Sequence, residues 1–323
     1  MKIETILNFV LEKKHSAFFY TPSFYPKSYS YFFKQVKFVE NIKLIDSNAA
    51  TIDLNELWKG IDSNSKKYFG YGIVPYEFGF LLEKKLSTLL SNEQRSAITE
   101  NFIFAFFDKN NFSQINSNKI DFGDFAPAAK LVNEIELEIP FSDYSTNIKK
   151  IKNYISAGDT YQINYTLKNK FSLANEITTL FKKLIFNQSS KYSAIINLGE
   201  RLIISISPEL FFNLEENKIT IKPMKGTIRR GCNIDEDKKK NEALKTSEKN
   251  LAENLMIVDL IRNDLGKICE FNSVRTKKLF EVEKYESIYQ MVSTIDGRLK
   301  KDLKLSDVLK NIFPCGSITG APK

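Results

Sequence analysis

Three carboxylates and an arginine lie within one strongly apolar run, residues 253–266, whose length predicts a helix buried on most sides. The carboxylates are Glu253, Asp259 and Asp264. Asp259 and Arg262 are three residues apart, so on a helix they can form an ion pair. Glu253 lies about 120° around the helix from Asp259, and we expect it to have no cationic partner three or four residues away. A buried charge is costly unless it is paired or bound to a metal. Glu253 therefore indicates either a bound cation or a partner from a distant segment.

Two further residues could carry acid–base and nucleophilic chemistry. Glu209 follows Pro208 between two apolar runs. A carboxyl group there would be partly desolvated, which raises its pKa and suits it to act as a general acid; the alternative is a salt-bridged glutamate at a strand end. Lys225 lies between Met224 and Gly226. A desolvated lysine near other cations gives up its proton more readily and becomes a nucleophile, whereas the alternative is an ordinary surface lysine.

The histidine and cysteine counts exclude several kinds of site. His15 is the only histidine, and its polar surroundings indicate a surface residue. Ser-His and Cys-His nucleophilic sites need a histidine beside the nucleophile, so proton transfer must fall to Glu, Asp, Lys or Tyr. The three cysteines, Cys232, Cys269 and Cys315, are widely spaced, which argues against both a disulfide framework and a zinc site.

The composition is that of a globular protein, with 42% apolar and 13% aromatic residues in a chain of 323. No apolar run approaches a membrane span and the first residues do not resemble a signal peptide, so we expect a cytoplasmic protein that does not engage a membrane. The net charge of +8 could indicate a non-catalytic protein that binds nucleic acid. The basic residues are scattered, however, and the densest run, residues 238–240, lies beside three acidic residues. We therefore expect no nucleic-acid partner.

The elements that must position these residues read as a mixed α+β pattern of antiparallel sheets flanked by helices. The helix that carries Glu253 is expected over residues 247–265, with Ser247 as N-cap and Gly266 as C′ residue. Residues 161–167 alternate as a strand, and Gly158 should end a helix over residues 145–156. The other expected strands are 68–74, 102–107, 193–198, 202–206, 210–214, 219–221 and 288–295, and the polar turn 215–218 is expected to join strands 210–214 and 219–221 into a hairpin. The other helices are 83–90, 176–186, 236–245 and 306–311, and 110–119 is expected to be a loop. A boundary near Pro140 divides the chain into regions 1–140 and 141–323.

Four long motifs occur in an order that resembles the chorismate-utilising enzymes, which include aminodeoxychorismate, anthranilate, isochorismate and salicylate synthases. They are residues 157–162, residues 207–209 leading to 222–227, residues 253–266 and residues 313–323. The resemblance covers residue 141 to the end strongly and the first 140 residues weakly. It implies two packed antiparallel sheets with helices on the outside.

The resemblance also implies roles for individual residues. Glu209 matches the general acid for loss of the chorismate C4 hydroxyl. Lys225 matches a lysine that can attack the ring covalently, where anthranilate synthases carry Ala. Gln162 stands where isochorismate and salicylate synthases place a lysine that activates water. Gln162 and Lys225 together favour amination at C4 to 4-amino-4-deoxychorismate, for 4-aminobenzoate and folate; anthranilate synthase component I is the alternative.

The remaining implied contacts concern the substrate and a metal. Glu253 matches a Mg²⁺ ligand that would share the ion with a chorismate carboxylate. Gly226 and Thr227 look like donors to a substrate carboxylate, since glycine permits close approach, and Gln290 stands where many relatives have His. The substrate-binding residues are thus expected to be Gln162, Gly226, Thr227, Gln290, Thr319 and Gly320.

Two further expectations concern what must join this chain. Relatives continue after the fourth motif with a substrate-binding Tyr and Arg and a second Mg²⁺ ligand. Because the sequence stops at Lys323, we expect a fold that is incomplete at its C-terminus, and a chain that is inactive or weakly active unless a fragment complements it. Glutamine amidotransferases of the class-I type use a Cys and a His, for which no plausible pair exists here. We therefore expect the chain to use ammonia and to need a separate glutaminase subunit for glutamine.

Overall fold

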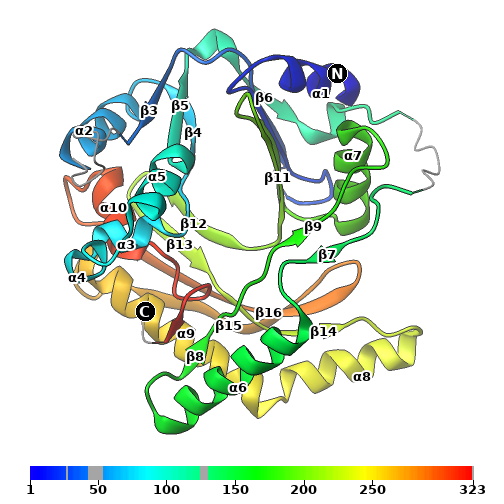
Figure 1. The fold of residues 1–323 in the computed structure, drawn as a ribbon, viewed down its shortest axis with the longest axis vertical. Helices are drawn as coiled ribbons and strands as arrows, with labels where there is room; N and C mark the ends of the chain where they lie inside the picture. The colour runs from blue at the N-terminus through cyan, green and yellow to red at the C-terminus, as the bar shows by residue number, and fades with distance from the viewer. Residues whose placement is uncertain (27, 43–53, 124–129, 322–323) are drawn as a thin grey trace.

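The computed structural model describes residues 1–26, 28–42, 54–123 and 130–321. In these residues the strands form two five-stranded sheets, one three-stranded sheet and two short strand pairs, all antiparallel (Figure 1). The expected α+β class with helices outside antiparallel sheets is confirmed. No helix in these residues combines the length and apolar character needed to cross a membrane. Pro322 and Lys323, the last residues of the fourth motif, lie outside the described residues.

The first five-stranded sheet is covered by two helices. α1 (Ile3–Glu12) and α7 (Ile177–Gln188) bury their apolar stripes against it, with Ile6 and Phe181 among the fully buried side chains. Strands from both sides of residue 140 share this sheet, and the division into regions 1–140 and 141–323 stays a prediction. In spatial order the strands are β11 (Leu202–Ser207), β10 (Tyr192–Asn197), β1 (Ala17–Tyr20), β2 (Tyr29–Phe33) and β6 (Phe112–Asn116).

The second five-stranded sheet is built around its longest strand, β16 (Ile288–Arg298), which pairs with three of the other four strands. A tight turn at Glu216, whose φ is 55°, joins the strands over residues 210–215 and 218–222 into the expected hairpin. A cavity of about 770 Å³ is lined by residues of both five-stranded sheets. The other strands are β12 (Leu210–Glu215), β13 (Lys218–Lys222), β14 (Met224–Arg229) and β15 (Arg275–Lys284).

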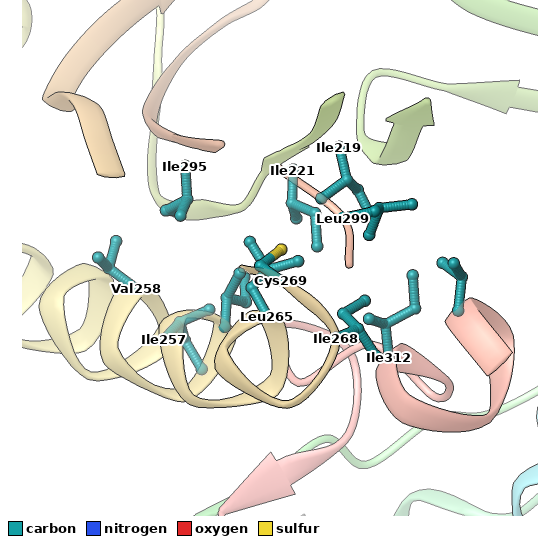
Figure 2. Packing of buried hydrophobic residues seen from close by; sticks show 12 residues of the cluster. Ile219, Ile221, Ile257, Val258, Leu265, Ile268, Cys269, Ile295, Leu299 and Ile312 are labelled. Atoms are coloured by element: carbon teal, nitrogen blue, oxygen red, sulfur yellow. The ribbon is translucent and has the colours of Figure 1, made fainter. Parts of the chain in front are cut away.

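Helix α9 (Glu248–Ile268) packs across this second sheet. Ile257, Leu265 and other apolar residues on one face meet Ile221 and Ile295 of the strands (Figure 2). Helix α10 (Leu305–Ile312) adds Val308 and Ile312 to the same core, and α8 (Ile234–Lys245) contributes Leu244 beside β16.

The ends and faces of α9 correct two expectations. Ser247 is the N-cap, as expected, because its side chain accepts a hydrogen bond from the Asn250 N–H. Gly266 is not the C′ residue: the helix runs to Ile268, since Leu265 and Ile268 are both anchored in the core. The helix is also amphipathic rather than buried on most sides, and the Asp259 side chain is 79% exposed.

The N-terminal half supplies the three-stranded sheet and its helices. This sheet packs on the first through Phe107 and Ala194, while the helices share Trp58 and Phe102 with α10. Residues 110–119 are not a loop, because β6 lies between two 3₁₀ turns at Lys109–Asn111 and Ser117–Lys119. The elements are β3 (Phe38–Asn41), β5 (Ile103–Phe107), β4 (Phe69–Ile73), α2 (Leu54–Asn64), α3 (Phe78–Leu82), α4 (Lys84–Ser87) and α5 (Asn92–Asn101).

Residues 130–179 form an arm without a core of its own. All fifty are described, and none of them is buried. The arm holds α6 (Phe141–Ala157), ended by Gly158 at φ 81° as expected, and the strand pair β7 (Glu136–Leu137) and β9 (Asn169–Lys170). Of the strand expected over residues 161–167, the structure forms β8 (Gln162–Ile163), which pairs with β17 (Gly320–Ala321).

Candidate active site

Glu209 lies directly before β12, on the connection from β11 of the first sheet, and is half-buried. The Ser317 hydroxyl donates a hydrogen bond of 2.7 Å to its Oε1. Burial raises the pKa of the Glu209 carboxyl, while hydrogen bonds from Ser317 and the Met224 backbone and the charge of Lys225 oppose the rise. The net pKa shift is upward, so the environment favours the protonated acid that a proton donor needs.

A cavity of about 280 Å³ opens beside this carboxyl. Its walls are mostly apolar and include Tyr76, Phe211 and Phe313, with Ser317 and Glu209 as polar groups. An apolar cavity with a few convergent polar groups is the usual form of a small-molecule site.

Lys225 lies in a bulge of β14. Met224 pairs with Val292 and Thr227 with Gln290, so two residues of β14, Lys225 and Gly226, face a single residue of β16. Bulges of this kind redirect side chains and are frequent beside active sites. Two cations close to Lys225 in the sequence, Lys222 and Arg230, have partners of their own, in the ion pairs Lys222–Glu283 at 3.1 Å and Arg230–Asp237 at 2.6 Å.

Gly226 is fixed by the backbone of the same bulge. Its φ is +98°, and an added Cβ would lie 3.1 Å from Cβ of Asn250 on α9, so both backbone conformation and packing require glycine. The Thr227 hydroxyl donates to Oε1 of Gln290 at 2.9 Å across the strand pair. Thr227 and Gln290 are therefore brought together, and the Thr227 hydroxyl proton is already engaged.

Gln162, Thr319 and Gly320 meet at the β8–β17 pair. Gly320 pairs with Ile163, and an added Cβ on Gly320 would lie 2.3 Å from the Gln162 carbonyl oxygen. All three residues line a second cavity, of about 780 Å³, that reaches Asn263 on α9. The Asn164 side chain donates to the Ile318 carbonyl at 2.9 Å, which ties this pair to the loop that carries Ser317.

Glu253 stands apart from these groups on the outer part of α9. Its side chain is 40% exposed, and the Lys249 Nζ lies 3.9 Å from its Oε1. The expectation that Glu253 lacks a cationic partner is therefore wrong, because Lys249 precedes it by one helical turn. The Asp259–Arg262 pair forms at 3.4 Å, on the exposed side of the helix. Among the described residues no group of three or more His, Cys, Asp or Glu could hold a metal ion.

Two further residues beside Glu209, Ser317 and Cys315, show no chemical pattern of their own in the sequence. Ser317 is 4% exposed and hydrogen-bonds Glu209, although 108 positions separate the two in the chain. Cys315 lies 3.2 Å from the Ser317 hydroxyl and lines the Glu209 cavity. Both residues belong to the fourth motif, and that motif was the only signal in the sequence that could have singled them out.

The arrangement supplies an acid, an amine and a cavity. Glu209 can donate a proton into an apolar pocket, and Lys225 is close enough for its charge to act on that carboxyl. The loop of Ser317 and Thr319 connects this pair to Gln162. A small polar molecule that loses a hydroxyl group is the kind of substrate that such groups could process.

The family of chorismate binding enzymes has a model that matches residues 34–323. Aminodeoxychorismate synthase component 1 from Klebsiella aerogenes is 39% identical over 181 residues, 56% of this chain and 40% of that protein. Anthranilate synthase component 1 from Aquifex aeolicus is 34% identical over 201 residues, 59% of this chain and 41% of that protein. The chain thus spans less than half the length of these curated relatives.

Two solved structures have the same fold. Anthranilate synthase component I from Streptococcus pneumoniae superposes with a TM-score of 0.73 at 20% identity, covering 93% of this chain and 75% of that chain. The menaquinone-specific isochorismate synthase from Escherichia coli gives a TM-score of 0.68 at 11% identity, covering 98% of this chain and 72% of that chain. At these identities the likeness shows the shared fold alone.

Proposed function

This chain belongs to the chorismate binding enzymes, and on that premise we propose that it aminates chorismate at C4 to give 4-amino-4-deoxychorismate, the precursor of 4-aminobenzoate and folate. The observation that carries the proposal is the Glu209 carboxyl, which borders a small cavity. Burial raises the pKa of this carboxyl, although the charge of nearby Lys225 opposes the rise. The relatives named aminodeoxychorismate synthase, at 36% to 41% identity, support the choice within the family.

The proposed reaction exchanges a hydroxyl for an amino group without oxidation or reduction. Glu209 gives its proton to the C4 hydroxyl, the C–O bond breaks and water leaves. The Lys225 amine forms a C–N bond to the ring, and ammonia then adds at C4 while the bond to Lys225 breaks, which returns the amine. The ammonium group formed at C4 gives one proton back to the Glu209 carboxylate, so that chorismate and ammonia become 4-amino-4-deoxychorismate and water. Gly226 and Gln290 would hold a substrate carboxylate, and Gln162, Thr319 and Gly320 would contact the opposite part of the ring.

The test is to incubate the protein with chorismate, Mg²⁺ and an ammonium salt, and to identify the product by liquid chromatography and mass spectrometry. We expect 4-amino-4-deoxychorismate. Formation of anthranilate would instead support the second candidate, anthranilate synthase component I, which the Aquifex aeolicus relative favours. If ammonium gives neither product, whether or not a complementing C-terminal fragment of a relative is added, amination is refuted.

We also propose a glutaminase partner. The same incubation with glutamine in place of ammonium should give no product, because the chain holds a single histidine and no plausible Cys-His pair. Addition of a glutamine amidotransferase subunit should restore turnover. Glutamine-dependent turnover by the purified chain would contradict this part of the proposal.

Mg²⁺ is proposed as the ion that binds the substrate carboxylate, with Glu253 as one ligand. The donor set fits only such a shared site, because one half-exposed carboxylate with Lys249 nearby holds Mg²⁺ weakly without substrate oxygens. We therefore expect Glu253→Gln to raise the Mg²⁺ concentration for half-maximal activity by about tenfold or more. Calorimetry in the presence of chorismate should likewise show that Glu253→Gln binds Mg²⁺ more weakly than the unmodified protein does.

The control for this prediction is Asp259→Asn, which removes an exposed carboxylate from the same helix. That variant should keep the Mg²⁺ dependence of the unmodified protein. An unchanged Mg²⁺ requirement in Glu253→Gln would remove Glu253 from the metal site.

Ser317→Ala should move the alkaline limb of the pH–rate profile to higher pH. The Ser317 hydrogen bond stabilises the ionised Glu209 carboxylate and lowers its pKa, so its loss raises the pKa further. A general acid works in its protonated form, and the rate falls as the pH rises through that pKa. The test is to measure rates across the pH range for Ser317→Ala and for a control, Ser205→Ala, which changes an exposed serine on β11. A limb that moves to lower pH would contradict it.

A further inference from the structure

Asn254, beside Glu253 on α9, is fully buried and faces the second sheet. Its side-chain amide donates to the carbonyl oxygens of Lys225 at 3.3 Å and Met291 at 3.4 Å. Lys225 lies in the β14 bulge, and Met291 is the single β16 residue that the bulge faces. A bulge disrupts the ladder locally and leaves backbone groups without strand partners. Both amide hydrogens of Asn254 are thus bound to carbonyls at the bulge.

Ser293 fixes the orientation of this amide. Its hydroxyl donates to Oδ1 of Asn254 at 2.6 Å and accepts a hydrogen bond from the Phe280 N–H at 3.1 Å. Phe280 lies in a second bulge, on β15, where Leu279 and Phe280 face Ser293, and its φ is +58°. Asn254 and Ser293, each 0% exposed, therefore link irregularities on the two sides of β16.

The bulge decides where the Lys225 side chain points. Neighbouring residues of a strand face opposite sides of the sheet, so gaining or losing one residue of register turns a side chain to the other face. In the present register the Lys225 charge acts on Glu209, and the Met224 backbone hydrogen-bonds that carboxyl. Without the hydrogen bonds that Asn254 donates to the carbonyls of Lys225 and Met291, a regular pairing of β14 with β16 would compete with the bulge.

We propose that Asn254, held by Ser293, is a positioning residue that maintains the β14 bulge and so directs the Lys225 amine toward Glu209. The inference rests on the proposed function for its catalytic meaning, but its geometric part can be tested without turnover. Asn254 touches neither substrate nor the reacting atoms in this scheme. It acts through the backbone of Lys225.

The first readout is the labelling rate of individual lysines by acetic anhydride, followed by peptide mass spectrometry. Lys225 is half-buried in the unmodified protein. In Asn254→Ala we expect it to turn toward solvent and to be labelled several-fold faster, while the labelling of other lysines stays unchanged. Ser293→Ala keeps the amide but removes its support, and should give a smaller change in the same direction. It provides a milder test if Asn254→Ala fails to fold.

Asn197→Ala is the matched control. Asn197 is also a buried asparagine whose amide donates to two carbonyls, those of Val10 at 2.8 Å and Leu11 at 2.9 Å, but it lies in the first sheet. Its loss should lower the melting temperature comparably while Lys225 labelling stays unchanged. An equal change in Lys225 labelling in the control would reduce the effect to general destabilisation and overturn the proposal.

The second readout is kinetic. In Asn254→Ala we expect kcat to fall by about tenfold or more while the KM for chorismate changes little. Added to Lys225→Ala, the same substitution should cost nothing further, because residues that act as a unit are not additive. Unchanged Lys225 labelling in Asn254→Ala, or full additivity with Lys225→Ala, would overturn the positioning role. If Lys225 labelling changes in Asn254→Ala while the unmodified protein does not aminate chorismate, the positioning role stands and the proposed function is refuted.

Discussion

Lys225→Ala is expected to lose chorismate amination by about a thousandfold or more, which corresponds to about 4 kcal/mol in the barrier. In the proposed mechanism alanine removes the amine that bonds to the ring, while the neighbouring bulge and Gly226 keep their backbone arrangement. Steady-state rates with ammonium measure the loss. The KM for chorismate should change much less, because the proposed substrate contacts come mainly from other residues.

The control is Lys277→Ala, which removes an exposed lysine from β15. It should retain full activity. Amination by Lys225→Ala at the unmodified rate would exclude a covalent role for this lysine. Production of anthranilate by the variant would show in addition that the chemistry of the alternative family members needs no lysine here.

Glu209→Gln is expected to lose activity by about two to four orders of magnitude, the usual contribution of a positioned acid or base. Glutamine keeps the shape of the side chain and its contact with Ser317 but has no proton to give to the leaving hydroxyl. Rates measured across the pH range should show that the alkaline limb set by Glu209 has disappeared. An exposed glutamate in the turn before β16, Glu286, provides the control as Glu286→Gln.

The stability of the same variant relative to the unmodified protein should rise with pH. Burial raises the folded-state pKa of Glu209 above its ordinary value. The favourable contribution of Glu209 to the free energy of folding is therefore complete below its ordinary pKa, and it is lost as the pH rises through the raised pKa of the folded state. Glutamine does not ionise, so the melting temperature of Glu209→Gln relative to the unmodified protein should increase with pH through this window. A difference that shrinks with rising pH would contradict the assigned shift.

Local signals in the sequence predicted much of the framework. Ser247 marked the start of α9 because an N-cap is read from a few adjacent residues, and Gly158 marked the end of α6 for the same reason. The hairpin of β12 and β13 followed from a short polar turn between apolar runs. Each of these features is decided within about ten residues, which is the range over which spacing carries information.

Features set by tertiary contacts were not predictable in this way. Gly266 interrupts the pattern of α9, yet the helix continues because burial of Ile268 outweighs a glycine cost of about 1 kcal/mol. The alternation over residues 161–167 is a good strand pattern, but only β8 has a partner strand. The Ser317–Glu209 hydrogen bond joins residues far apart in the chain. No local rule could have supplied these contacts.

The arm of residues 130–179 gives the two parts of the candidate site unequal resistance to local opening. Amides in β16 are held by the core beneath α9 and should exchange with deuterium only on global unfolding. Those in α6 and β8 lack buried side chains, and most of the stability of a helix in a protein comes from packing of its apolar face. Hydrogen exchange there should proceed through low-energy opening. A substrate that bridges Glu209 and Gln162 would therefore spend part of its binding free energy on ordering the arm, and its affinity should report on the folding equilibrium of α6 as well as on the contacts it makes.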